Sequence, residues 1–204
     1  MRSYRHYCGL ARSLDVVGDR WVLLIVRELI EGPRRYNELL DGLPGIATNL
    51  LAERLRVLEE AGVLTRNKDL TYSLTDWGQG LRDVVYALGR WAQPLMGRQA
   101  DDDAFRSHWL AHPIRLLYDG LDKRRPPLTV EVNTGDAPMT VKSAGGRVSV
   151  VPGRPASPDL VLSGPPDGVA GLLAGRLDRA AAGKRGVTIK GDVRKLAQLL
   201  PVRG

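Results

Sequence analysis

The sequence has one cysteine, Cys8, and no apolar run longer than the one from Trp21 to Val26. A single cysteine cannot form an intrachain disulfide, which favours a reducing cytoplasm. The apolar run is far shorter than the roughly 20 residues that span a bilayer, so no membrane partner is expected. The N-terminal stretch MRSYRHYCGLARSLD interrupts each short apolar patch with charge, unlike a signal peptide. The sequence therefore predicts a cytoplasmic protein.

Motifs for catalysis are missing as well. We find no nucleophile–base arrangement, phosphate-binding loop or dinucleotide fingerprint, so we expect neither an enzyme nor a bound cofactor. His108 and His112 are four residues apart and could share a helix face, but no third ligand accompanies them convincingly. We interpret them as part of a solvated helix face and expect no metal site.

The net charge of +7 is spread unevenly. Residues 1–100 contain 14 Lys and Arg against 12 Asp and Glu, whereas residues 101–204 contain 16 against 11. A net positive charge suits an acidic partner such as nucleic acid, but the excess of basic residues is not concentrated in the first half of the chain. The argument for a partner therefore depends on where individual charges lie.

Helical periodicity dominates the sequence up to about residue 98. Apolar residues at steps of three and four predict one or two amphipathic helices over 9–30 and a short helix over 36–43, which GLPG ends. A second amphipathic helix is expected at 47–61. The alternating stretch VLTRNKDLTYSLT then predicts a hairpin with its turn at 67–69. A further helix, capped by Thr75 or Asp76, carries an apolar stripe as far as Leu95.

The helix at 47–61 has two different faces. Leu51, Leu55 and Leu58 belong in a core, whereas the opposite arc is mostly polar. A short helix, a tight turn, this helix and a hairpin make a winged helix-turn-helix, whose second helix enters a major groove of double-stranded DNA while the hairpin contacts phosphates. The alternative is a helical bundle with a merely solvated polar arc. We expect base contacts from Thr48, Asn49 and Arg56, and phosphate contacts from Arg34, Arg35, Arg66 and Lys68.

These residues also carry a family resemblance. The segments GDRWVLLIVREL, GPRRYNEL, LPGI, LAERLRVLEEAG and YSLT stand in the order and spacing of the HxlR family of bacterial winged-helix transcription regulators, which the chain resembles over about residues 7–96. The resemblance implies a homodimer that binds DNA, with the first and last helices of this domain in the dimer contact. The apolar stripe from Leu81 to Leu95 supports that contact independently, because one small domain struggles to bury it alone.

Two residues of the helix at 47–61 depart from an ideal pattern. The family usually has serine where Ala47 stands, so the expected side-chain cap is missing unless Thr48 replaces it. Arg54 falls within the apolar arc and should not face DNA. Because an unpaired charge there is costly, we expect an ion pair with a carboxylate of the preceding short helix, Glu38 above all.

Cys8 is expected at the start of the first helix, close in sequence to Arg5 and His6. Such a setting can lower the pKa of a thiol and favour thiolate chemistry. The resemblance implies a further role, since members of the family use a cysteine at this position to sense oxidants or electrophiles. Because the chain has no resolving cysteine, we favour a small, buried, inert residue over a redox site.

The second half predicts a different domain. Alternating runs at 128–133, 139–144, 147–153 and 159–164 predict mainly antiparallel strands, followed by helices, a last strand at GVTIKGD and a helix at VRKLAQLL. The order of these segments resembles the sterol-carrier-protein-2-like fold over roughly 115–201. That resemblance implies an apolar tunnel between sheet and helices. We expect an α+β protein with a winged-helix domain at 1–98, a linker and bridging helix at 99–114, and a sterol-carrier-like α+β domain at 115–204.

Two functions fit these features. The first is a homodimeric transcription regulator on a near-palindromic DNA site, whose second domain adds dimer contact or senses an apolar small-molecule effector. The second is a lipid or small-molecule carrier whose helical half mediates only association. The polar arc of the helix at 47–61 favours the first.

Overall fold

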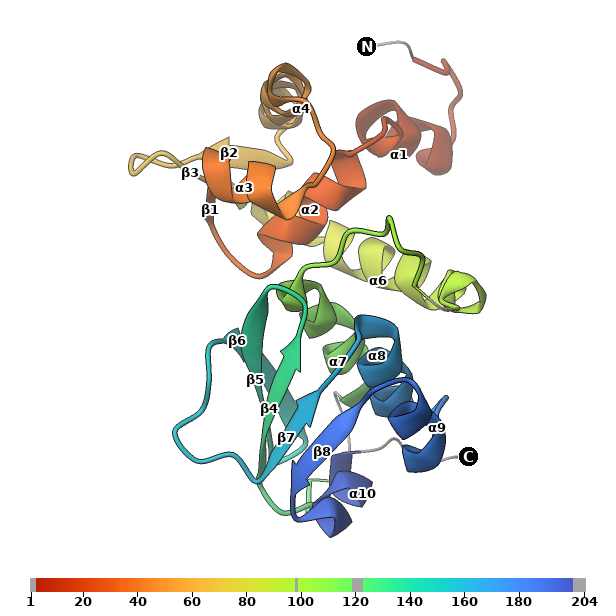
Figure 1. Cartoon of the computed structure of the whole chain (residues 1–204). Coiled ribbons are helices and arrows are strands. Elements are labelled where there is room, and N and C mark those ends of the chain that lie inside the picture. The colour runs from red at the N-terminus through yellow and green to blue at the C-terminus, as the bar shows by residue number, and fades with distance from the viewer. Residues whose placement is uncertain (1–2, 98, 119–122, 200–204) are drawn as a thin grey trace. The chain divides into compact units, whose positions relative to one another are not determined.

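The computed structural model describes residues 3–97, 99–118 and 123–199. The chain, drawn in Figure 1, divides into two compact units, Met1–Trp91 and Ala92–Gly204. Each unit has its own hydrophobic core.

The first unit is mainly helical. Its core forms where α2 packs against the helices and the small sheet that follow it, and Ile25, Leu39 and Leu55 are almost completely buried there. The elements of this unit are α1 (Gly9–Val17), α2 (Val22–Ile30), β1 (Arg34–Arg35), α3 (Tyr36–Gly42), α4 (Thr48–Glu60), β2 (Leu64–Arg66), β3 (Thr71–Leu74), α5 (Asp76–Gln79) and α6 (Leu81–Trp91).

The predicted hairpin is confirmed as β2 and β3, and β1 adds a third antiparallel strand on the other side of β3. Asn67, Lys68 and Asp69 lie in its turn, as the sequence predicts. Thr75 caps the next helix, because its hydroxyl accepts a hydrogen bond from the Gly78 backbone N–H. This hairpin projects from the unit beside α4 (Figure 1).

The helix expected from Thr75 to Leu95 is not continuous. It is divided into α5, α6 and the 3-10 turn η1 (Gln93–Leu95). Gly78 lies so close to the chain that a Cβ there would be 1.9 Å from the Val63 carbonyl oxygen, which fixes α5 against the start of the hairpin. Pro94 lacks the N–H that a longer α6 would need, and it disfavours helical geometry at Gln93.

The second unit contains a five-stranded sheet in the order β6-β5-β4-β7-β8. All neighbouring pairs are antiparallel except β4 with β7, which run parallel. The elements are η1, η2 (Ser107–Leu110), α7 (Ala111–Tyr118), β4 (Leu128–Thr134), β5 (Ala137–Ala144), β6 (Arg147–Pro152), β7 (Leu160–Ser163), α8 (Pro166–Leu173), α9 (Arg179–Lys184), β8 (Thr188–Gly191), η3 (Val193–Lys195) and α10 (Leu196–Leu199).

The alternation read from the sequence sets the two faces of this sheet. Val130, Val132, Val141 and Leu162 point to the core face, where residues of α7, α8 and α9 pack against them. Helices α7 and α8 lie on the same side of the sheet (Figure 1). The sheet is therefore mixed but mainly antiparallel, and this unit is sheet-rich with helices over one face.

Candidate nucleic-acid interface

Helix α4 lies with its leucines in the core and its polar arc outside. Leu51, Leu55 and Leu58 are each at most 1% exposed, whereas Thr48, Asn49 and Arg56 are exposed. The spacing of three and four residues places the leucines on one side of the helix. The polar arc is thus available to a partner and is not packed inside the unit.

The first turn of α4 is held by its neighbours without a capping side chain. Ala47 occupies the N-cap position with extended backbone, and Thr48 is already the first helical residue. Thr48 therefore does not replace the missing cap. The Tyr36 hydroxyl donates to the Thr48 carbonyl oxygen at 2.6 Å, which ties α3 to the start of α4. The Asn49 side-chain oxygen accepts from the Leu50 N–H at 3.0 Å.

Charge changes along α4. The exposed residues of the first turn, Thr48 and Asn49, are uncharged, whereas Glu53, Glu59 and Glu60 follow towards the C-terminus. Arg56 pairs with Glu60 at 2.5 Å in the i,i+4 arrangement, so its guanidinium is partly neutralised. Carboxylates repel phosphates. The N-terminal turn is therefore the part of α4 best suited to approach base edges. For Arg56 to contact a base, its guanidinium must break the ion pair with Glu60 or bind the base and Glu60 together.

The cations of the three-stranded sheet lie on two faces. The strand register places Arg34, Tyr72 and Arg66 opposite one another across β1, β3 and β2, and directly paired residues share a face. The Arg66 guanidinium lies 6.0 Å from the centre of the Tyr72 ring. Arg35 pairs with Thr71, so its side chain leaves from the opposite face. The structure therefore brings Arg34 and Arg66 together and separates Arg35 from them.

The turn of the hairpin is built from side-chain hydrogen bonds that sequence reasoning missed. Thr71 donates its hydroxyl to the Asp69 carboxylate at 2.7 Å and its N–H at 3.2 Å, and these bonds hold the pKa of Asp69 below its usual value. The Asn67 amide donates to the Thr71 and Ser73 hydroxyls. Lys68 is exposed at this fixed turn. The Asn-x-Asp-x-Thr spacing is the signal that could have predicted it.

The hairpin is also fastened to α4. The Glu59 carboxylate accepts a hydrogen bond from the Arg66 backbone N–H at 3.1 Å. Glu59 lies at the C-terminal end of α4, and Arg66 ends β2. The bond therefore fixes where the hairpin leaves the helix, which places Arg66 relative to the polar arc.

The predicted pair of Arg54 with Glu38 is wrong. Arg54 instead pairs with Asp19 at 3.4 Å and with Glu53 at 3.3 Å. The Glu38 carboxylate accepts from the Arg35 backbone N–H at 2.6 Å, because the third residue of a helix commonly folds back onto its N-cap. Arg54 does face away from the polar arc, and its side chain is 18% exposed.

The expectation that Cys8 is buried is also wrong. Cys8 occupies the N-cap position of α1, and its side chain is exposed in the single chain. Tyr4 and Tyr7, which precede it, are exposed as well.

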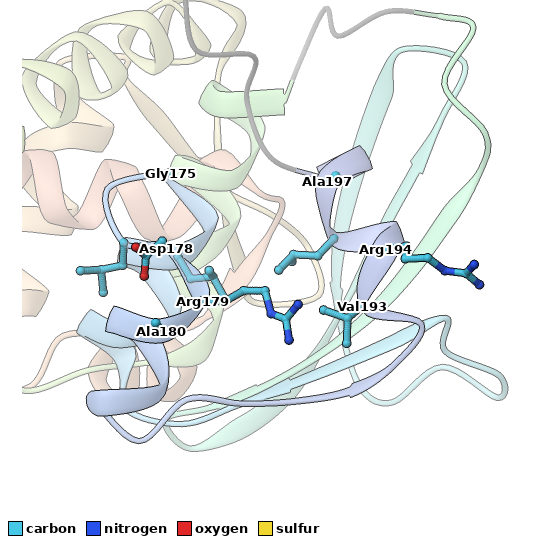
Figure 2. A pocket seen from close by; sticks show the side chains of 10 residues that line it. Gly175, Asp178, Arg179, Ala180, Val193, Arg194 and Ala197 are labelled. Atoms are coloured by element: carbon cyan, nitrogen blue, oxygen red, sulfur yellow. The ribbon is translucent and has the colours of Figure 1, made fainter.

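The second unit contains a cleft of about 600 Å³ between α8, α9 and the C-terminal turns (Figure 2). Leucine and valine side chains line it together with the charged Asp178, Arg179 and Arg194, and Figure 2 shows Arg179 extending towards Val193. His108 and His112 lie elsewhere, on η2 and α7. The expected solvated face is wrong for His112, which is buried. Within the described ranges, no three His, Cys, Asp or Glu side chains are grouped so that they could hold a metal ion.

Comparison with known proteins decides what the first unit is. The model of the HxlR-like helix-turn-helix family matches residues 16–100. The uncharacterized HTH-type transcriptional regulator YvaP of Bacillus subtilis is 36% identical over 87 residues, which cover 40% of this chain and 81% of YvaP. The chain belongs to the HxlR-like helix-turn-helix family.

Other bacterial proteins match the chain similarly. The uncharacterized HTH-type transcriptional regulator sll1512 of Synechocystis is 37% identical over 89 residues, which are 41% of this chain and 66% of that protein. The crystal structure of quinone-bound YodB from B. subtilis is 33% identical and covers 43% of this chain and 98% of that chain, with a TM-score of 0.40. YvaP and sll1512 are HTH-type transcriptional regulators, and with the family match they indicate that this chain is a DNA-binding regulator.

The family match ends at residue 100, so the sterol-carrier-protein-2-like identity of the second unit stays a prediction. None of the helices in the described part of the chain is both long and apolar enough to cross a bilayer.

Proposed function

We propose that the chain regulates transcription as a homodimer bound to a near-palindromic DNA site. The first turn of α4 in each protomer enters a major groove, and the two grooves lie about one helical turn apart. Thr48, Asn49 and Arg56 contact bases, while Arg34, Arg35, Arg66 and Lys68 contact phosphates. The observation that carries the proposal is the exposed, uncharged first turn of α4 above three buried leucines.

Exposed apolar residues support the homodimer. Helix α6 has no buried residue, and although Leu81 and Val85 pack against the core, Val84, Leu88 and Trp91 do not. Trp91 is 76% exposed, as is Leu95 just beyond α6. Leu10 and Leu14 of α1 are exposed too. Monomers rarely leave so many large apolar side chains in water, and a two-fold contact through α1 and α6 would cover them.

The cleft between α8 and α9 supports an apolar small-molecule effector. Its volume falls in the range of ligand pockets, and leucine, valine and alanine side chains line it together with Asp178, Arg179 and Arg194. A ligand that binds this cleft more tightly in one state of the dimer would shift the DNA-binding equilibrium. The same cleft would serve the alternative function, a carrier for apolar molecules.

The deciding experiment is selection of duplexes from a random library by the full chain, followed by footprinting and light scattering. The proposal predicts a protected site with two related half-sites about 10 base pairs apart and a particle of twice the chain mass. Failure to select any duplex, together with binding of an apolar fluorescent probe, would instead support the carrier.

A variant that fills the cleft tests whether ligand binding by the second unit is independent of DNA binding by the first. Ala180 lies on α9 at the cleft, so Ala180→Phe is expected to abolish binding of an apolar fluorescent probe and to leave DNA affinity unchanged. Lys184 is exposed on the same helix, so Lys184→Ala is the matched control and should retain probe binding. Unchanged probe binding by Ala180→Phe would exclude this cleft as the effector site.

A further inference from the structure

The corner between α1 and α2, residues Gly18–Trp21, contacts α4, the recognition helix that we propose enters the major groove. Its backbone is tightly determined. The Gly18 N–H donates to the Leu14 carbonyl oxygen, and a Cβ on Gly18 would approach that oxygen to 2.4 Å. The Asp19 carbonyl oxygen accepts from the Val22 N–H at 3.2 Å and starts α2. The backbone that carries Asp19 and Trp21 is therefore fixed, while the Asp19 side chain itself is 60% exposed.

Trp21 provides the first contact. Its φ of 80° is left-handed, a conformation that a bulky residue adopts only where its surroundings impose it. Its ring packs against the core and reaches within 3.7 Å of the Cβ position at Gly45, in the turn between α3 and α4. The Arg20 guanidinium lies 5.6 Å from the same ring. The strained backbone thus directs the indole onto the entrance of α4.

Asp19 provides the second contact, further along the helix. Its carboxylate pairs with Arg54, which lies six residues beyond Thr48 and therefore about 9 Å along the axis of α4. Arg54 Nε is buried and has no hydrogen-bond partner, so the guanidinium depends on its two carboxylates. Of these, Glu53 belongs to α4 itself and cannot position the helix. Asp19 joins α4 to another element.

We propose that Asp19 is a positioning residue for DNA recognition. Two contacts separated along α4, Trp21 at its entrance and Asp19 at Arg54, fix the direction of the helix relative to the α1–α2 corner. The buried leucines of α4 and the Tyr36–Thr48 hydrogen bond still hold the helix, so removing the second contact shifts its direction by a small amount about the first. The polar first turn then presents Thr48 and Asn49 at a less favourable angle to the groove. The inference rests on the proposed function.

The test compares Asp19→Ala with wild type on two DNAs: the duplex that wild type selects from a random library and an unrelated duplex of equal length. We expect affinity for the selected duplex to fall about fivefold, the scale of one partly exposed ion pair, and affinity for the unrelated duplex to stay level or rise. Electrostatics alone predicts that affinity for the selected duplex rises, because Asp19→Ala removes a negative charge that repels phosphates. The ratio of the two affinities is the readout.

Glu53→Ala is the matched control, because it removes the other carboxylate on Arg54 without separating α4 from the corner. It should preserve the ratio. Arg54→Met, which keeps the length of the side chain, should lower the ratio as Asp19→Ala does, and the double variant should lower it no further.

Several outcomes would overturn the inference. These are an unchanged ratio in Asp19→Ala, an equal loss on both duplexes together with a lower melting temperature, or a ratio in Glu53→Ala that falls as far. If wild type selects no duplex, the proposed function fails and this inference with it. If wild type selects one and Asp19→Ala keeps the ratio, the inference alone fails.

Discussion

Replacing Arg66 by alanine removes a cation that the strand register aligns with Arg34 across Tyr72. The four proposed phosphate contacts, Arg34, Arg35, Arg66 and Lys68, become eight in a homodimer. Each phosphate neutralised contributes about −0.9 to the slope of log affinity against log salt, so wild type should show a slope near −7. Loss of Arg66 from both protomers should reduce the slope by about 1.8.

The measurement is fluorescence anisotropy of a labelled selected duplex, titrated at several salt concentrations between 50 and 200 mM. Over that range the wild-type affinity is expected to fall on the order of 10⁴-fold. Arg66→Lys keeps the charge and should keep the slope, although it weakens the contact with Tyr72. Lys184→Ala, in the second unit, should behave as wild type.

Distinct results would contradict different parts of this reasoning. An unchanged slope in Arg66→Ala would show that Arg66 does not neutralise a phosphate. A changed sequence preference at constant slope would assign it to bases instead. A slope reduced by only about 0.9 would indicate that one copy of Arg66 contacts DNA, which contradicts the two-fold arrangement.

Three other predictions concern assembly and stability. Leu88→Glu on the exposed side of α6 should convert the dimer to a folded monomer in light scattering, whereas Arg82→Ala on the same helix should not. Leu55→Ala should lower the free energy of unfolding by about 2–5 kcal/mol in urea titrations, because it empties a buried site, and the exposed Ala52→Ser should lower it much less. Hydrogen bonds from Lys195 and the Thr129 N–H hold the pKa of Asp159 below its usual value. A lowered pKa means stability that is present above the unfolded value of about 3.9 and lost as pH falls below it, so Asp159→Asn should flatten the acid side of the melting-temperature profile.

The recognition helix and the hairpin could be predicted because each depends on a local period. Leucines at steps of three and four decide which side of α4 is buried, and alternation around the Asn67 turn decides where the strands pair. The same reasoning applied to strand β1 would have predicted Arg34 and Arg35 on opposite faces of the small sheet, since adjacent strand residues point to opposite faces. Local patterns therefore give the elements and their faces.

Partners distant in the sequence could not be predicted in this way. A helical wheel places Arg54 on the apolar side but gives no reason to choose Asp19, which reaches it only because the α1–α2 corner folds over α4. Likewise, the exposure of Cys8 depends on how residues 3–7 lie and not on their composition. Tertiary packing decides both.

The parallel pairing of β4 with β7 has a consequence for synthesis. Strand β4 lies at the centre of the sheet, but its second neighbour is made only after β5, β6 and a further loop have left the ribosome. Until then the nascent chain carries an open, valine-rich edge whose backbone groups can pair with another chain. A protein truncated after Pro152 would keep that edge permanently, and its β4–β6 meander should aggregate where the full-length chain remains dispersed.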